Sequence, residues 1–201
     1  PLSVKEFSKV MKTGDRKAVF DALYRIEDAS AAVPAVISAL KSASGDETVA
    51  DLVWWLGEQK YDGATDMLSQ YLASPNAAIR EEAAWALVKS GDKNAASLIA
   101  TMLEGDESDV QVALECLKSC AGDVAGVVAP HYQNVSAAGQ KAIVNLLGQR
   151  NSVIWKDIVY DALFSEDAAL SKAAADALPN VVENSDIIKL YTLLESSSPE
   201  E

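Results

Sequence analysis

Residues 76–92 read NAAIREEAAWALVKSGD and hold the start, the buried face and the end of one α-helix. Asn76 follows a Ser-Pro pair and is a residue type that caps helix N-termini. Alanines stand three and four residues before Leu87, a spacing that places all three side chains on one helix face. Gly91 lies where a helix has to stop. The stretch therefore predicts a helix near 76–90 whose buried face is made of small residues and one leucine.

The same pattern recurs along the 201-residue chain every 30 to 33 residues. The leucine that anchors each copy is found at Leu23, Leu56, Leu87, Leu117, Leu147 and Leu178. A second anchor follows 15 to 17 residues later, at Leu40, Leu72, Leu103, Tyr132, Leu163 and Leu194. A fixed period of this length with helical patterning is typical of a helical solenoid. Each copy predicts two helices, a longer inner one and an outer one.

The period sets the expected elements and one continuous domain over residues 1–201. We expect hairpin repeats near 2–28, 30–60, 61–91, 92–121, 122–149 and 150–178, with a terminal helix at 185–195. The inner helices are expected near 15–27, 46–58, 76–90, 107–120, 137–148 and 167–178, and the outer ones near 3–12, 30–43, 63–73, 94–104, 123–133 and 151–164. The aspartates that recur at inner-helix starts are expected to cap them, at Asp15, Asp46, Asp106 and Asp167.

Composition narrows the classes of partner. Hydrophobic residues make up 49% of the chain and the formal net charge is −13. The acidic balance argues against nucleic acid, because such binding needs Lys and Arg against phosphates, and against an anionic membrane surface. No apolar run is long enough for a membrane span, so we expect no membrane insertion. The charge favours a soluble protein with a protein or peptide partner, a basic one above all.

Cellular compartment and oligomeric state are not fixed by the sequence. The chain begins at Pro1 without a Met and without a signal-like apolar segment, which indicates a processed chain or one module of a larger protein. A cytoplasmic location is favoured slightly, and an exported protein that has lost its signal peptide is the alternative. Cys116 and Cys120 lie four residues apart on one expected helix and are interpreted as two buried thiols.

Residues 76–92 resemble the inner helix of a HEAT repeat, and residues 32–40, AVPAVISAL, resemble its outer helix. The most similar subclass is the HEAT-like repeat named after phycobilisome lyases, and Arg80 matches the arginine of that motif. The equivalent positions of other copies depart from the motif, at Val49, Val110, Gln140 and Ser171. The resemblance implies an all-α, right-handed α-α superhelix of the armadillo type. Repeats of this kind serve as scaffolds, adaptors, lyases and DNA-repair enzymes, so the fold alone does not fix the function.

One column of the inner helices is a candidate binding surface. The position two before each anchor leucine is never aliphatic and reads Asp21, Trp54, Trp85, Glu115, Asn145 and Asp176. The family's geometry would turn this column to the concave face. Trp54 and Trp85 would then be neighbours near Asp51 and Glu82, and aromatic faces rimmed by acids attract Lys or Arg. An alternative is that both tryptophans fill space between repeats, as we expect for Trp55, whose column is apolar.

No catalytic residue, cofactor or metal is predicted. Cys116, Cys120 and His131 are too few for a zinc site, and the thiols and the imidazole belong to different faces of the expected hairpins. The acidic turn Asp106–Asp109 lacks the alternating ligands of a calcium loop and is interpreted as a helix cap. The chain has no phosphate loop, nucleophile elbow or HExxH sequence.

The leading hypothesis is a non-catalytic scaffold or adaptor that binds a protein or peptide on its concave face. The residues predicted to bind it are Trp54, Trp85, Asp51, Glu82, Glu115 and Asn145. A first alternative, implied by the resemblance alone, is a bilin-lyase-like enzyme or a chaperone for a chromophore-carrying protein. A second is a nucleic-acid-binding or DNA-repair protein, which the charge disfavours.

Overall fold

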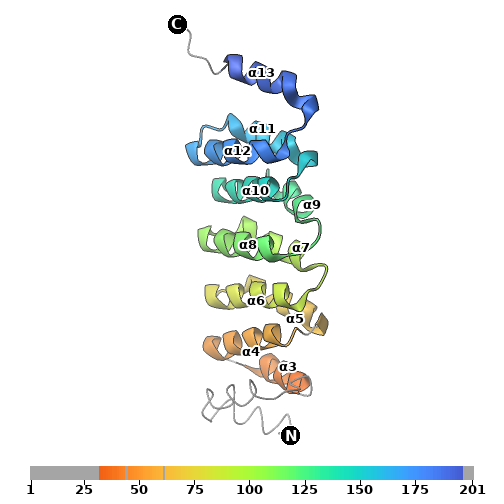
Figure 1. Cartoon of the computed structure of the whole chain (residues 1–201). Helices are drawn as coiled ribbons and strands as arrows, with labels where there is room; N and C mark the ends of the chain where they lie inside the picture. Colours follow the sequence, from red (N-terminus) through yellow and green to blue (C-terminus); the bar gives the residue numbers. More distant parts are fainter. Residues whose placement is uncertain (1–31, 44, 61, 197–201) are drawn as a thin grey trace. The chain divides into compact units, whose positions relative to one another are not determined.

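Helices make up every regular element in residues 32–43, 45–60 and 62–196, which are the residues described by the structure, a computed structural model. These residues fall into two compact units that divide after Gly122, and each is described by itself (Figure 1). The predicted first hairpin, over residues 2–28, lies outside the described residues. The expectation of one domain over the whole chain stays a prediction.

The described part of the first unit holds three inner helices, each preceded by a shorter outer helix. The outer helices are α3 (Val33–Ser42), α5 (Thr65–Gln70, with 3₁₀ turns at Asp62–Ala64 and Tyr71–Ala73) and α7 (Ala95–Ala100, with a 3₁₀ turn at Thr101–Glu104). The inner helices are α4 (Asp46–Glu58), α6 (Ala77–Ser90) and α8 (Glu107–Ser119). Within this unit α4 packs on α6 and α6 on α8, and Figure 1 shows the three in successive layers.

The second unit repeats this plan. Its outer helices are α9 (Val124–Val128, with a 3₁₀ turn at Ala129–His131), α11 (Lys156–Leu163, after a 3₁₀ turn at Val153–Trp155) and α13 (Ile187–Ser196, after a 3₁₀ turn at Asn184–Asp186). Its inner helices are α10 (Ala137–Gln149) and α12 (Ala168–Val181). Helix α12 packs against both α10 and α11.

The helices expected within the described residues are found with shifts at their ends, and the all-α fold class is confirmed. The helices expected near 3–12 and 15–27 lie outside the described residues. The outer helices are shorter than expected, because parts of the ranges expected at 123–133 and 151–164 form 3₁₀ turns instead of α-helix.

Helix α12 is longer than expected and continues through Pro179 to Val181 instead of ending near 178. A proline inside a helix removes one backbone hydrogen bond, which argues for an earlier end. Val181 is fully buried, so the hydrophobic gain from its side chain offsets that cost in the last turn.

Two of the three expected aspartate caps that lie among the described residues form. Asp106 accepts a hydrogen bond from the backbone N–H of Asp109 at 3.0 Å, and Asp167 accepts one from Ala169 at 2.8 Å. The prediction for Asp46 is wrong, because Gly45 is the N-cap of α4 and makes no side-chain cap. Asp15 lies outside the described residues.

The repeat anchors form the core of each unit. Four of them are fully buried, at Leu56, Leu87, Leu117 and Leu147. Leu178 in α12 is only half-buried, although it occupies the same repeat position. The face of α12 that carries Leu178 is therefore less covered than its counterparts.

Candidate functional site

Helices α4 and α6 run side by side and are tied together at both ends. At their N-terminal ends the side-chain amide of Asn76 donates to the carboxylate of Asp46 at 2.9 Å. At their C-terminal ends Glu58 and Lys89 form an ion pair. These two contacts fix a parallel register, so that equivalent residues of the two helices stand at the same height.

Trp54 and Trp85 occupy equivalent places on this helix pair and remain at its surface. Both side chains are half-buried, while the residues that follow them, Trp55 and Ala86, are buried. Trp55 is fully buried, as its apolar column predicts. Trp54 and Trp85 thus lie on a face of α4 and α6 that is outside the buried core.

Charged side chains surround the two indoles at helical spacing. Asp51 and Glu82 lie one turn before Trp54 and Trp85, and Glu58 and Lys89 lie one turn after them. We refer to these residues together as the tryptophan face: Asp51, Trp54, Glu58, Glu82, Trp85 and Lys89. All six are half-buried.

The carboxylate of Glu82 on the tryptophan face has a raised pKa. Partial burial raises the pKa of Glu82, and the negative charges of Glu81, Asp51 and Glu58 raise it further. Lys89 acts in the opposite direction. Nearby positive charge therefore does not fully balance the negative charge of ionised Glu82. A further cation close to Glu82 would lower the free energy of its ionised form.

Two of the predicted site residues lie on helices other than α4 and α6. Glu115 of α8 is exposed and pairs with Lys118 at 2.7 Å on its own helix. Asn145 is half-buried on α10 and belongs to the second unit, which is described separately. Of the six predicted residues, Trp54, Trp85, Asp51 and Glu82 therefore gather on α4 and α6.

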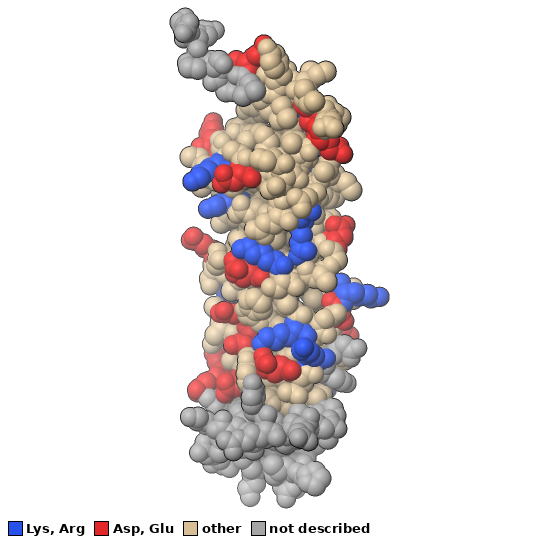
Figure 2. All heavy atoms as spheres, in the orientation of Figure 1, with Lys and Arg blue, Asp and Glu red and all other residues tan. Residues whose placement is uncertain are grey.

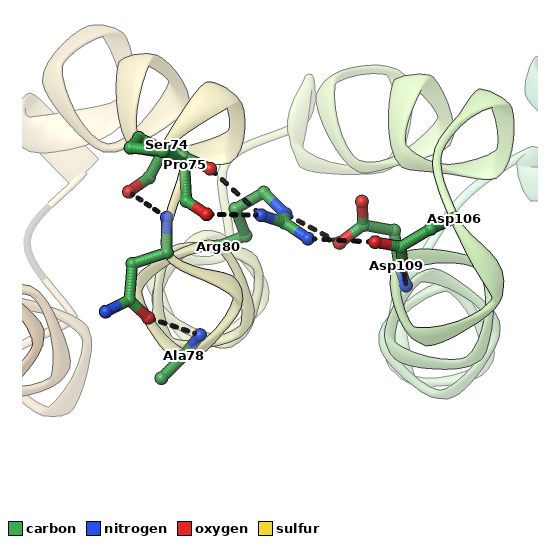
Figure 3. Close-up of polar contacts among 7 residues, drawn as sticks. Ser74, Pro75, Ala78, Arg80, Asp106 and Asp109 are labelled. Carbon is green, nitrogen blue, oxygen red and sulfur yellow. Dashed lines mark hydrogen bonds and ion pairs between the residues drawn. The ribbon is translucent and has the colours of Figure 1, made fainter.

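An arginine network joins α6 to α8 (Figure 3). Nε of Arg80 lies 2.7 Å from Oδ1 of Asp109, and Nη2 lies 3.4 Å from the carboxylate of Asp106. Nη1 donates to the backbone carbonyl of Ser74 at 3.0 Å. Arg80 therefore links the turn before α6 to the start of α8. The sequence analysis interpreted the acidic turn only as a helix cap and missed its pairing with Arg80. The available signal was Arg80 itself, which lies 26 residues before Asp106 and 29 before Asp109.

The cysteines have the environment of structural thiols. Cys116 and Cys120 are both buried. Burial raises the pKa of the Cys116 thiol to about 12, so it is protonated at neutral pH and a poor nucleophile. Among the described residues no group of three or more His, Cys, Asp or Glu side chains is arranged to hold a metal ion.

The surface of both units is mixed in charge. In Figure 2 the Lys and Arg side chains stand beside Asp and Glu side chains on the face in view. Within residues 32–43, 45–60 and 62–196, no helix combines the length and hydropathy that crossing a bilayer requires.

Parallel stacking of equivalent helices from successive hairpins defines a helical repeat protein, a class whose units contact mainly their neighbours. The family model for HEAT repeats matches residues 33–118, which cover α3 to α8 except its last residue. Residues 33–118 are therefore similar to HEAT repeats, as the resemblance of residues 76–92 implied. Proteins of this kind generally bind other proteins rather than act as catalysts.

A solved structure agrees with this fold. The complex of CpcE and CpcF of phycocyanin lyase from Nostoc sp. PCC7120 superimposes with a TM-score of 0.51 at 23% identity, covering 100% of this chain and 90% of that one. An engineered protein gives a TM-score of 0.49 at 16% identity, covering 89% of this chain and 96% of that one. No curated protein matches the sequence.

Proposed function

We propose that the chain is a binding scaffold whose tryptophan face receives a segment of another protein, with a Lys or Arg side chain of that segment against Trp54 or Trp85. The observation that carries the proposal is the surface position of two indoles at the same height on adjacent helices. A large aromatic side chain in the core would bury its whole surface, and these two do not.

The charges around the indoles favour a cationic guest. Asp51 and Glu82 come from neighbouring helices, and each raises the cost of ionising the other. A guanidinium or ammonium group at this place would attract both carboxylates and both ring faces. The whole chain, with 30 acidic against 17 basic residues, would also attract a basic segment over a longer range.

The helix pair offers a rigid base for such a contact. The Asn76–Asp46 hydrogen bond and the Glu58–Lys89 ion pair hold α4 and α6 at both ends. Little conformational entropy is therefore lost in the scaffold when a partner binds. In the Glu58–Lys89 ion pair, the ammonium group of a lysine on α6 already contacts a carboxylate of α4.

A peptide selection tests the proposal. The immobilised protein is used to select from a random peptide library, and selected peptides are measured against the wild type and against Trp54→Ala/Trp85→Ala. Trp155→Ala, which removes a half-buried tryptophan of the second unit, is the matched control. We expect enrichment of Lys and Arg, at least a tenfold weaker affinity for the double variant and an unchanged affinity for the control. Equal affinities for the wild type and the folded double variant would remove the tryptophan face from consideration.

A further inference from the structure

A pocket of about 380 Å³ lies in the first unit between the outer helices α5 and α7. The C-terminal turns of these two helices form its walls, and the start of α8 closes one side. Its lining combines apolar side chains with a few polar ones, chiefly Leu72, Leu98, Met102, Ser69, Thr101 and Asp109. Sites of roughly 300–1,000 Å³ with this mixture commonly hold small molecules.

The pocket leaves an outer anchor leucine partly uncovered. Leu72 is half-buried, whereas Leu40 and Leu103, which hold the same repeat position in their own hairpins, are 2% and 0% exposed. Leu98 is half-buried as well, and Met102 is buried. The apolar wall of the pocket is therefore suited to the carbon chain of a ligand.

The carboxylate of Asp109 stands at the polar end of the pocket. The side chain of Asp109 is 14% exposed, and its Oδ1 accepts a hydrogen bond from Nε of Arg80 at 2.7 Å. Its Oδ2 lies against Gly105, where a Cβ would come within 2.5 Å of it. Gly105 also lines the pocket, so Oδ2 is on the pocket side, and no described residue donates a hydrogen bond to it.

The hydroxyl groups that line the pocket have no proton to offer a ligand. Ser69 donates to the backbone carbonyl of Asp66 at 2.9 Å, and Thr101 donates to that of Leu98 at 2.7 Å. A hydroxyl group carries one proton, so these bonds leave only lone pairs free. The polar lining therefore accepts hydrogen bonds, and a ligand has to supply the donors.

The ion network beside the pocket has one negative charge in excess. Arg80 faces two carboxylates, Asp106 and Asp109, and its remaining nitrogen donates to the backbone carbonyl of Ser74. No guanidinium nitrogen of Arg80 is left for an anionic ligand. A cation at Oδ2 of Asp109 would balance the second carboxylate.

The other charges of the surrounding elements do not reverse this balance. Lys93 precedes α7 and lies at the N-terminal end of that helix, while the pocket lies at its C-terminal end. Lys118 lies in the last turn of α8, where it pairs with Glu115. The C-terminal turns of α5 and α7 carry a partial negative charge of their own. The exposed charged residues nearest in sequence to the pocket lining are acidic: Asp66, Glu104 and Glu107.

We propose that this pocket binds a small aliphatic primary amine, with its ammonium group on the carboxylate of Asp109 and its carbon chain against Leu72, Leu98 and Met102. The pocket shares no residue with the tryptophan face and the proposal does not depend on it. The chain would then combine a surface for a protein segment with a separate site for a small cationic ligand.

Hexylamine is the probe, and three further ligands divide its chemistry. 1-Hexanol keeps the chain without the charge, methylammonium keeps the charge without the chain, and N-acetyl-lysine amide stands for a lysine side chain of a peptide. NMR of methyl-labelled methionines in the whole chain measures binding, at the millimolar concentrations that suit ligands of this size. Met102 lines the pocket, and Met67 of α5, which does not, is the internal control.

The variants separate the pocket from the charge network beside it. Asp109→Asn keeps the shape of the side chain and removes its charge, and Asp106→Asn, which removes the other carboxylate facing Arg80 without touching the pocket, is the matched control. Ala73→Phe narrows the pocket from an exposed position and leaves the network intact, which keeps a test in hand if Asp109→Asn folds poorly.

We expect hexylamine to shift the Met102 signal and to bind at least tenfold more tightly than 1-hexanol or methylammonium. Asp109→Asn should weaken hexylamine binding at least tenfold and Ala73→Phe at least fivefold. Asp106→Asn should stay within threefold of the wild type, and Trp54→Ala/Trp85→Ala within twofold.

Three results would overturn the proposal. The first is that hexylamine leaves the Met102 signal in place or binds no more tightly than 1-hexanol. The second is an affinity equal to that of the wild type in folded Asp109→Asn or folded Ala73→Phe. The third is tighter binding of N-acetyl-lysine amide than of hexylamine, which would assign the pocket to a lysine side chain of a partner protein.

Discussion

Gly57 of α4 lies so close to Ala86 of α6 that a Cβ at position 57 would come within 2.6 Å of the Cα of Ala86. Gly148 has the same relationship to Ala177 in the second unit. Both glycines follow an anchor leucine, and both alanines precede the next one. The repeat therefore uses a glycine–alanine contact for its closest helix pairs, while Val88 takes the glycine's place between α6 and α8.

Gly57→Ala should destabilise the protein by about 1–3 kcal/mol, because the new methyl group is forced against backbone. The direction of the stability change is informative, because replacing glycine by alanine inside an unhindered helix stabilises by roughly 0.5–1 kcal/mol. Urea unfolding measures the difference. Gly45→Ala is the control for added bulk, with its nearest contact at 3.8 Å, and should cost about 0.5–1 kcal/mol because alanine is a poorer N-cap than glycine. A stabilised Gly57→Ala variant would contradict the close packing of α4 and α6.

Arg80→Lys should destabilise the protein by roughly 1–3 kcal/mol, because an ammonium group cannot reach Asp109 and the Ser74 carbonyl together. Lys118→Met breaks the more exposed pair with Glu115 and should cost about 0.5 kcal/mol or less. Chemical unfolding of both variants, compared at the same pH, checks the ranking. Equal losses would mean that the Arg80 network adds no more than a surface ion pair.

Glu82→Gln should be more stable than the wild type at pH 7. The folded protein raises the pKa of Glu82, so the folded state holds its proton to higher pH than the unfolded state, and the wild type loses stability as pH rises from the ordinary value of 4.5 through the raised one. The advantage of the glutamine should shrink below pH 4.5, where both states are protonated. Unfolding curves at pH 7 and pH 4 test this. A variant that is less stable at pH 7 would show that Glu82 is well compensated.

Cys116 should resist thiol reagents in the native protein, because burial both shields the sulfur atom and suppresses its thiolate. In a Cys120→Ala background, reaction with a disulfide reagent at pH 8 should be at least a hundredfold slower than in urea. Rapid modification of the folded protein would contradict this prediction and would indicate that the Cys116 thiol is accessible and reactive.

The sequence predicts the helices well because the anchor leucines repeat at a fixed period and the inner helices carry strong start and stop residues. It locates Trp54 and Trp85 on one column, and that column holds no aliphatic residue. It does not show that Glu115 pairs with Lys118, because this pairing depends on rotamers within α8. It also leaves open which side of α13 faces outward, since that helix is apolar on both.

The most direct test of the tryptophan face is an NMR titration of the four indole N–H signals with a selected Lys- or Arg-containing peptide, each signal being assigned from a single tryptophan variant. The account predicts that the signals of Trp54 and Trp85 shift and saturate together, and that the signal of Trp155 stays in place. A peptide that binds tightly while leaving Trp54 and Trp85 unmoved would contradict the account.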